Sequence, residues 1–128
     1  MLKRGDKIGI VACSNALSPK DKNRIEELAD AFANLGLTAI LSQYIFAENS
    51  VFSGTGAERA GAFNDFYRDE GIKAVFDISG GDIANELLNY IDYETVKQHP
   101  KPFFGYSDLT TIDNAIYAKP GYPSYLYQ

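Results

Sequence analysis

The chain has 128 residues, of which 45% are hydrophobic and 23% charged, so we expect one globular domain with a hydrophobic core. A formal net charge of -5 and the lack of polybasic runs argue against a nucleic-acid-binding surface and against a membrane-binding one. The single cysteine, Cys13, excludes an internal disulfide and is typical of a reducing compartment. No signal-peptide pattern and no apolar run of transmembrane length is present, so we expect a cytoplasmic protein.

Short apolar segments alternate with amphipathic ones along the chain. Residues 7–12, KIGIVA, are typical of a strand buried on both faces. A helix is predicted next, with Ser18 as its N-cap, Pro19 at its first position and Gly36 as its stop. Further strands are predicted at 37–42, 72–79, 101–106 and within 120–128, further helices at 57–71, 82–91, 93–98 and 107–119, and an exposed loop at 47–56.

This alternation favours an α/β fold, a mainly parallel sheet with helices on both faces in three layers. Ligands of such sheets bind beyond the carboxyl ends of the strands. The unusual residues of this chain follow strands: CSN after the first, SGGD after the third and YSD after the fourth. We therefore expect a functional site at that edge of the sheet.

Ser107 follows the fourth strand and opens the last predicted helix. A serine at a sharp strand-to-helix turn is typical of the nucleophile elbow G-x-S-x-G, although Leu109 replaces the final glycine here. The backbone N–H of Asp108 would then donate to an oxyanion. The alternative is that Ser107 only caps the helix while Asp108 complements its dipole. The local pattern alone favours the cap.

The turn at residues 79–82 has the same strand-to-helix form. Its two glycines allow a ligand close approach to backbone N–H groups. The alternative is a tight connection with Asp82 as the N-cap of the next helix. Dinucleotide and P-loop fingerprints are missing, and no residues have metal-ligand spacing, so we expect neither a cofactor nor a metal.

The only histidine, His99, is a poor candidate for the base of Ser107. It precedes the fourth strand, and a strand of that length puts it ~20 Å from Ser107 at the opposite edge of the sheet. We interpret His99 as a surface residue and Cys13 as a small buried one. The chain therefore shows no general base for Ser107.

Three stretches, GDKIGIVACS, ERAGAFNDFYRDEGIKAVFDISGGDIANELLNYIDY and HPKPFFGYSDLTTIDNAIYAKPG, resemble the N-terminal domain of the LD-carboxypeptidase family of serine peptidases. The resemblance covers nearly the whole chain in order. It implies a flavodoxin-like fold similar to that of class I glutamine amidotransferases. It also implies that Ser107 is the nucleophile and that the amides of Asp108 and Gly81 form the oxyanion hole. Ser79, Gly80 and Asp82 would contact the substrate.

The resemblance further implies a Ser-His-Glu triad whose histidine and glutamate come from a second, C-terminal domain. Residues 1–128 would then be the nucleophile-bearing domain, inactive or nearly so alone, and the family suggests a homodimer. Murein LD-carboxypeptidases typically have Arg-Gly-Gly-Tyr-Gly at the glycine turn, where this chain has Ser79-Gly80-Gly81-Asp82. This departure favours the microcin-C self-immunity branch, with an aminoacyl-nucleotide amide rather than a murein tetrapeptide as substrate.

Two other interpretations stay open at this point. The chain could be a non-catalytic flavodoxin-like domain for ligand binding or protein interaction, with Ser107 as a helix cap. It could also be a stable unit of a longer product, exposing the apolar surface that normally meets the second domain and self-associating through it.

Overall fold

A computed structural model describes residues 1–127, which form a five-stranded, fully parallel sheet in the order β2-β1-β3-β4-β5. This is the strand order of flavodoxin-like proteins. The strands are β1 (Lys7–Val11), β2 (Thr38–Leu41), β3 (Ile72–Asp77), β4 (Phe103–Gly105) and β5 (Tyr125–Leu126). The prediction of a three-layer α/β fold is confirmed.

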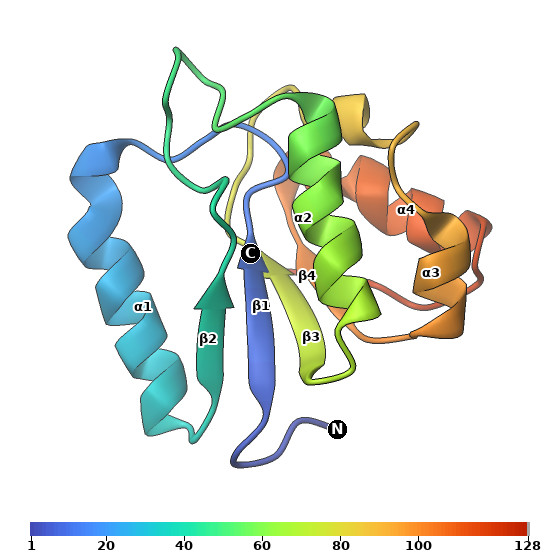
Figure 1. The fold of residues 1–128 in the computed structure, drawn as a ribbon, viewed down its shortest axis with the longest axis horizontal. Coiled ribbons are helices and arrows are strands. Elements are labelled where there is room, and N and C mark those ends of the chain that lie inside the picture. The colour runs from blue at the N-terminus through green and yellow to red at the C-terminus, as the bar shows by residue number, and fades with distance from the viewer. Residues whose placement is uncertain (128) are drawn as a thin grey trace.

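The helices are α1 (Lys22–Asn34), α2 (Gly56–Arg68), α3 (Tyr93–Gln98) and α4 (Thr110–Ala118), with short 3-10 helices η1 (Pro19–Asp21), η2 (Ala84–Leu87) and η3 (Ser107–Leu109). Figure 1 shows α1 alone at the left of the sheet and α2, α3 and α4 grouped at the right. None of these helices is long and apolar enough to cross a bilayer, over the residues that the structure describes. The N-cap of Ser18, whose hydroxyl accepts from the Lys20 N–H, and Pro19 at the first position are confirmed, although they open η1 and α1 follows directly.

Each face of the sheet has its own hydrophobic core. Ile8 and Ile10 of β1 point to the α1 face, whereas Val11 and Cys13 join the larger core beneath α2, α3 and α4. Phe63, Tyr67 and Phe103 fill the centre of that larger core, and all three are fully buried. Cys13 is buried as predicted, and burial raises the pKa of its thiol. The site therefore stands at the edge of a sheet that has a hydrophobic core on each face.

The apolar faces of the helices differ in how well they are covered. On α2, Ala60, Phe63 and Tyr67 are fully buried and Phe66 is half-buried. On α1 only Ile25 is buried, and Leu35 at its end is 65% exposed. The amphipathic pattern predicted the helix correctly, but α1 has no helical neighbour on its own face to cover the rest of its apolar stripe.

The helix predicted at residues 82–91 is wrong. Only the 3-10 helix η2 forms, and the N–H groups of Tyr90 and Ile91 both return to the Leu87 carbonyl at 2.8 and 3.0 Å. At the start of the segment the Ala84 N–H donates to the Asp108 carboxylate at 3.0 Å. Tertiary hydrogen bonds of this kind outweigh local helix propensity.

The helix predicted at 107–119 is nearly right, since η3 supplies its first turn and α4 the rest. The fifth strand is confirmed as β5, and Gln128 lies outside the described residues.

Asp113 of α4 is an acidic residue that lies among buried apolar side chains of the same helix, Ile112 and Ile116. It is 7% exposed, and neither of its carboxylate oxygens has a hydrogen-bond partner among residues 1–127. Burial raises the pKa of this carboxyl group to about 6. Because the folded state holds the proton more tightly than the unfolded state, ionisation of Asp113 destabilises the fold as pH rises from about 4 to about 6.

We therefore expect Asp113→Asn to stabilise the chain at pH 7, by at most ~3 kcal/mol, and to change its stability little at pH 4. Urea unfolding at the two pH values measures this difference. Asp30→Asn, at an exposed position of α1, is the matched control and should have little effect at either pH. A stabilisation by Asp113→Asn that is equal at pH 4 and pH 7 would contradict the buried-charge explanation.

Candidate active site

Three loops at the carboxyl ends of adjacent strands β1, β3 and β4 meet at one edge of the sheet. The Ser14 hydroxyl, after β1, donates to the Asp108 carboxylate, after β4, at 2.5 Å. A Cβ built on Gly80, after β3, would lie 3.4 Å from the Ser107 Cβ. The structure thus brings the CSN, SGGD and YSD segments together, as the sequence predicted.

Ser107 has a left-handed backbone conformation, with a φ of +57°. Tyr106 before it is fully extended, so the backbone turns sharply between these two residues. Gly105 makes room for this turn, because a Cβ there would lie 2.9 Å from the Leu109 Cβ. A left-handed conformation in a residue other than glycine costs ~1–3 kcal/mol and is concentrated at functional sites.

The Ser107 side chain does not cap the helix. Tyr106 occupies the N-cap position of η3, and neither η3 nor α4 has a side-chain cap bond. Thr110 and Thr111 instead donate their hydroxyls to the Ser107 and Asp108 carbonyls, at 2.7 and 2.8 Å. Ser107 is exposed, and its hydroxyl makes no hydrogen bond within the described part of the chain. The cap alternative therefore has no support in the geometry, and the hydroxyl is free to meet a ligand.

The glycine turn lies directly beside Ser107. Gly81 has a φ of +147°, and a Cβ on it would lie 2.2 Å from the Asn15 Cγ, so only glycine fits there. The Asn15 side-chain carbonyl accepts from the Asp82 N–H at 3.2 Å, and Asp82 does not cap a helix. Asn15, the last residue of the CSN segment, thus fixes one side of this turn.

Ser79 lies beneath the turn and is 2% exposed. Its hydroxyl donates to the Asp77 carboxylate at 2.6 Å and accepts from the Ser14 N–H at 2.9 Å. The bond from Ser14 joins the loop after β1 to the loop after β3, and the bond to Asp77 holds the Ser79 side chain against the end of its own strand. Gly80, Gly81 and Asp82 form the upper part of the turn, closer to Ser107 and Asn15.

Asp77, the last residue of β3, organises the buried floor of the site and was missed in the sequence. It is fully buried and accepts from the N–H groups of Cys13 and Ser79, each at 2.8 Å. Burial raises the pKa of Asp77, and these hydrogen bonds oppose the rise. The sequence did contain a signal for this role. A carboxylate at the end of a buried apolar strand must find hydrogen-bond donors in the adjacent loops.

The sequence analysis also missed Arg59 of α2, whose buried guanidinium binds several of the loops around the site. Its guanidinium is fully buried, donates to the carbonyls of Cys13 and Gly54, and forms an ion pair with Glu86 of η2. A buried charge requires such a complete set of partners. Arg59 therefore connects the β1 loop, the loop before α2 and the segment that follows the glycine turn.

His99 lies at the opposite edge of the sheet from Ser107. It ends α3 just before β4 and lines a hollow of about 190 Å³ with Glu70 and Lys73. It is partly exposed, in keeping with its interpretation as a surface residue. The chain contains no other histidine, so no imidazole is available to Ser107 within these 128 residues.

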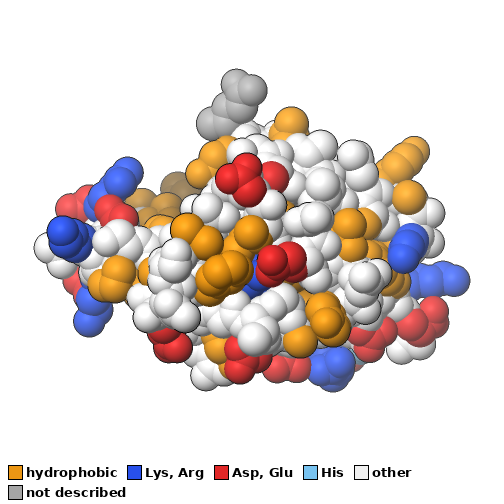
Figure 2. All heavy atoms as spheres, turned by 90° about the horizontal axis from the view of Figure 1, so that it is seen from above, with side chains coloured by type: hydrophobic (Ala, Val, Ile, Leu, Met, Phe, Trp, Pro, Cys, Tyr) orange, Lys and Arg blue, Asp and Glu red, His pale blue; other side chains and the backbone are white. Residues whose placement is uncertain are grey.

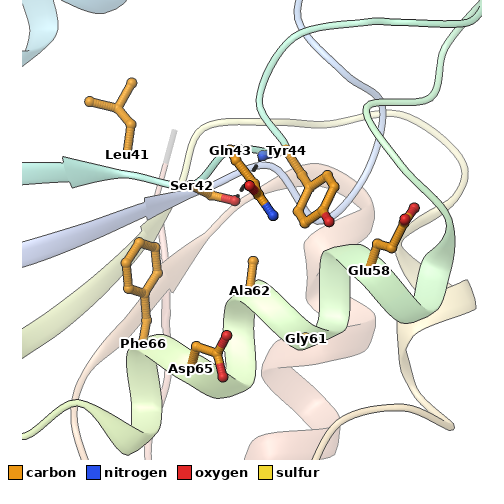
Figure 3. A pocket seen from close by; sticks show the side chains of 9 residues that line it. All are labelled: Leu41, Ser42, Gln43, Tyr44, Glu58, Gly61, Ala62, Asp65 and Phe66. Atoms are coloured by element: carbon orange, nitrogen blue, oxygen red, sulfur yellow. Dashed lines mark hydrogen bonds between the residues drawn. The ribbon is translucent and has the colours of Figure 1, made fainter.

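A separate hollow of about 420 Å³ lies between the end of β2 and α2. Figure 3 shows Ala62, Asp65 and Phe66 projecting from α2 toward this strand end. Its acidic side chains are already engaged, because Asp65 pairs with Arg68 and Glu58 closes the N-terminal cap of α2. The hollow contains none of the predicted site residues, so we do not assign it chemistry. Within the described residues, no group of acidic, cysteine and histidine side chains could hold a metal ion.

Comparison with known proteins identifies the family. A family model described as the LD-carboxypeptidase N-terminal domain matches residues 8–127. The chain belongs to the LD-carboxypeptidase family. The resemblance noted in the sequence is thereby confirmed, including its restriction to the N-terminal domain.

Individual members of the LD-carboxypeptidase family agree with this assignment. The Bacillus subtilis (strain 168) protein named "Putative carboxypeptidase YocD" is 35% identical over 97% of this chain and 38% of its own length. A structure of the microcin C7 self-immunity protein MccF in complex with aspartyl sulfamoyl adenosine superposes with a TM-score of 0.88, at 32% identity over 94% of this chain and 36% of that one. The MccF-like protein of Bacillus anthracis str. Ames gives 0.91, at 32% identity over 98% and 38%. The chain thus spans little more than a third of these relatives.

The backbone strain at Ser107 gives a stability prediction. We expect Ser107→Gly to raise the melting temperature, because glycine adopts a positive φ without cost, and Ser107→Ala to change stability by less than ~0.5 kcal/mol. Thr55→Ala is the control, since the Thr55 hydroxyl does cap α2, and it should cost ~1 kcal/mol. A loss for Ser107→Ala as large as that for Thr55→Ala would show that the Ser107 side chain caps its helix.

The buried guanidinium gives a second prediction. Arg59→Met leaves the Cys13 and Gly54 carbonyls without their donor, so it should reduce the free energy of unfolding by ~3–5 kcal/mol. Arg24→Met removes an exposed arginine of α1, whose side chain is 81% exposed, and should cost under ~1 kcal/mol. Urea denaturation of both variants tests the difference. Equal effects would mean that Arg59 does not hold the loops together.

Proposed function

We propose that this chain is the nucleophile-bearing domain of a serine-type amide hydrolase. The observation that carries the proposal is the Ser107 turn, with its left-handed backbone and an exposed hydroxyl that no neighbour engages. Such a turn aims a serine outward from the end of a strand, where an α/β hydrolase presents its nucleophile. Membership of the LD-carboxypeptidase family supports the same reaction class.

In this proposal the Ser107 oxygen attacks the amide carbonyl, forming an oxyanion, and a base takes the hydroxyl proton. The C–N bond then breaks, the leaving amine receives that proton, and water hydrolyses the acyl-enzyme ester. The N–H groups of Asp108 and Gly81 stabilise the oxyanion, and each such donor is typically worth ~3–4 kcal/mol in the transition state. Gly80 and Asp82 line the substrate's approach from the glycine turn.

The base comes from outside residues 1–128. The only histidine lies at the opposite edge of the sheet, and the aligned chain covers only 38% of the YocD protein. We propose that a histidine and a glutamate from a second domain complete a Ser-His-Glu triad. Since triad members act as a unit, residues 1–128 alone should be inactive or nearly so.

The substrate we favour is an aminoacyl or peptidyl group joined by an amide-like bond to a nucleotide analogue. Ser79-Gly80-Gly81-Asp82 lacks the arginine and third glycine typical of the murein branch. MccF, which has a solved complex with aspartyl sulfamoyl adenosine, is 32% identical to this chain. A murein LD-tetrapeptide is the alternative substrate in the same reaction class.

A non-catalytic role is the second candidate function. The missing base favours it for this polypeptide taken alone, because a flavodoxin-like sheet also serves as a ligand-binding scaffold. Under this alternative a longer product would bind a nucleotide or flavin without turnover. The free Ser107 hydroxyl and the strained turn argue against it, since strain of this kind is concentrated at functional sites.

The test compares the full-length gene product with residues 1–128 on aminoacyl-sulfamoyl adenosine and on an LD-tetrapeptide. We expect turnover by the full-length protein only, and a loss of at least ~10⁴-fold in kcat for Ser107→Ala. Ser50→Ala is a matched control, because Ser50 also has a positive φ, +55°, but lies in an exposed loop. Turnover by residues 1–128 that is lost in Ser107→Ala would refute the external base. Full activity in full-length Ser107→Ala would refute the nucleophile.

A further inference from the structure

The loop after β1 contacts both segments that carry the proposed oxyanion donors, Asp108 and Gly81. It consists of residues 13–15, and we call it the CSN loop. Ser14 bonds to the segment after β4, and Asn15 bonds to the glycine turn after β3. Neither side chain takes part in the bond-making steps of the proposed reaction, so these contacts have another role.

Backbone N–H groups are important at this edge of the sheet because cations are sparse there. Figure 2 looks down on the carboxyl ends of the strands, and most lysine and arginine side chains lie at the margins of this face. Arg59, which binds the CSN loop, is buried and already paired with Glu86. Within the part of the chain that the structure describes, a negative charge beside Ser107 therefore depends on backbone N–H groups, whose direction has to be fixed before the reaction.

Ser14 fixes the Asp108 amide through the Asp108 side chain. The Ser14 hydroxyl is fully buried and donates to one Asp108 carboxylate oxygen at 2.5 Å, and the same oxygen accepts from the Ala84 N–H at 3.0 Å. A hydrogen bond to a carboxylate is roughly twice as strong as one between neutral groups. A single methylene group joins this carboxylate to its own backbone, so fixing it also limits rotation of the peptide group between Ser107 and Asp108.

Asn15 fixes the other donor, the Gly81 amide. Glycine has more backbone freedom than any other residue, so a glycine N–H needs an external restraint to keep one direction. The Asn15 side chain packs on the Cα of Gly81, where a Cβ would lie 2.2 Å from the Asn15 Cγ. Its carbonyl oxygen accepts from the Asp82 N–H at 3.2 Å. The contact and the hydrogen bond together restrict the peptide groups on either side of Gly81.

Buried charged groups anchor the CSN loop itself. The Cys13 N–H donates to the Asp77 carboxylate at 2.8 Å, and the Cys13 carbonyl accepts from the Arg59 guanidinium. Both of these charged side chains are inaccessible to solvent. Satisfied polar networks of this kind make a loop rigid, so the CSN loop can hold the residues that it contacts in place.

We propose that Ser14 and Asn15 are positioning residues of the oxyanion hole. Ser14 orients the Asp108 amide through the Asp108 carboxylate, and Asn15 orients the Gly81 amide through the glycine turn. Both act through these amides and not through contact with the substrate. The inference rests on the proposed function in taking the two amides as oxyanion donors, and it adds which side chains hold them in place.

The first test measures kinetics of the full-length gene product on the substrate that it hydrolyses. Ser14→Ala and Asn15→Ala should each lower kcat by ~10–100-fold and change KM by less than ~2-fold, because a misdirected donor weakens binding of the transition state only. The affinity for the aldehyde analogue of the acyl group, which forms a tetrahedral adduct with Ser107, should fall by the same factor. The affinity for the carboxylic acid product should not change.

Two variants are matched controls for these substitutions. Ser53 is 1% exposed, and its hydroxyl has no partner among residues 1–127, so Ser53→Ala removes a buried hydroxyl that fixes no donor. The Asn64 side chain binds the Tyr90 carbonyl and the Asp92 N–H, each at 2.9 Å, away from the site. Asn64→Ala should lower the melting temperature but leave kcat within ~2-fold of the wild type.

The second test reads the positioning without turnover, by ¹⁵N relaxation of the full-length protein. The order parameter of the Asp108 amide should fall from ~0.85 to below ~0.6 in Ser14→Ala, and that of the Gly81 amide should fall likewise in Asn15→Ala. The Ser53→Ala and Asn64→Ala variants should leave both amides ordered.

The outcomes separate this inference from the proposed function. Unchanged order at both amides would overturn the positioning role, as would an unchanged kcat in an active enzyme. Equal losses of affinity for the aldehyde and for the product would overturn it too, since they would show that the substitutions only loosen the fold. A protein that hydrolyses neither substrate but loses amide order as expected would refute the function and support the positioning.

Discussion

The Asp108 carboxylate holds the candidate site together. One of its oxygens accepts from the Ser14 hydroxyl at 2.5 Å and from the Ala84 N–H at 3.0 Å, so the loops after β1 and β3 are fixed to the loop after β4. Asp108 is also the residue that follows Ser107, and its position sets the path of the strained turn. The same side chain therefore orients the proposed nucleophile and the glycine turn beside it.

Below this carboxylate, buried polar groups supply the rigidity that the strained turn requires. Asp77 binds two loop N–H groups and the Ser79 hydroxyl, while Arg59 binds two loop carbonyls and Glu86. A left-handed serine persists only where its surroundings over-determine the backbone. Fully satisfied networks of this kind are costly to break, so the turn is positioned before any substrate arrives.

The sequence predicted most of the fold because its local signals and its tertiary structure agree. Apolar runs gave the strands, and the spacing of Ala60, Phe63 and Tyr67 gave α2. The prediction failed at residues 82–91, where only the 3-10 helix η2 forms and the Ala84 N–H donates to the distant Asp108 carboxylate. Ser107 and the glycine turn could be found from their position after strands. Arg59 could not, because its role depends on loops distant in the sequence that only the folded sheet brings near.

The central claim is that Ser107 forms a covalent acyl intermediate in the full-length protein. Acid quenching during turnover of an aminoacyl-sulfamoyl adenosine, followed by peptide mapping with mass spectrometry, tests it directly. The account predicts that the peptide containing Ser107 gains the mass of the aminoacyl group and that no other peptide does. An acyl group on a different residue, or product formation with no acylated peptide at any time, would contradict it.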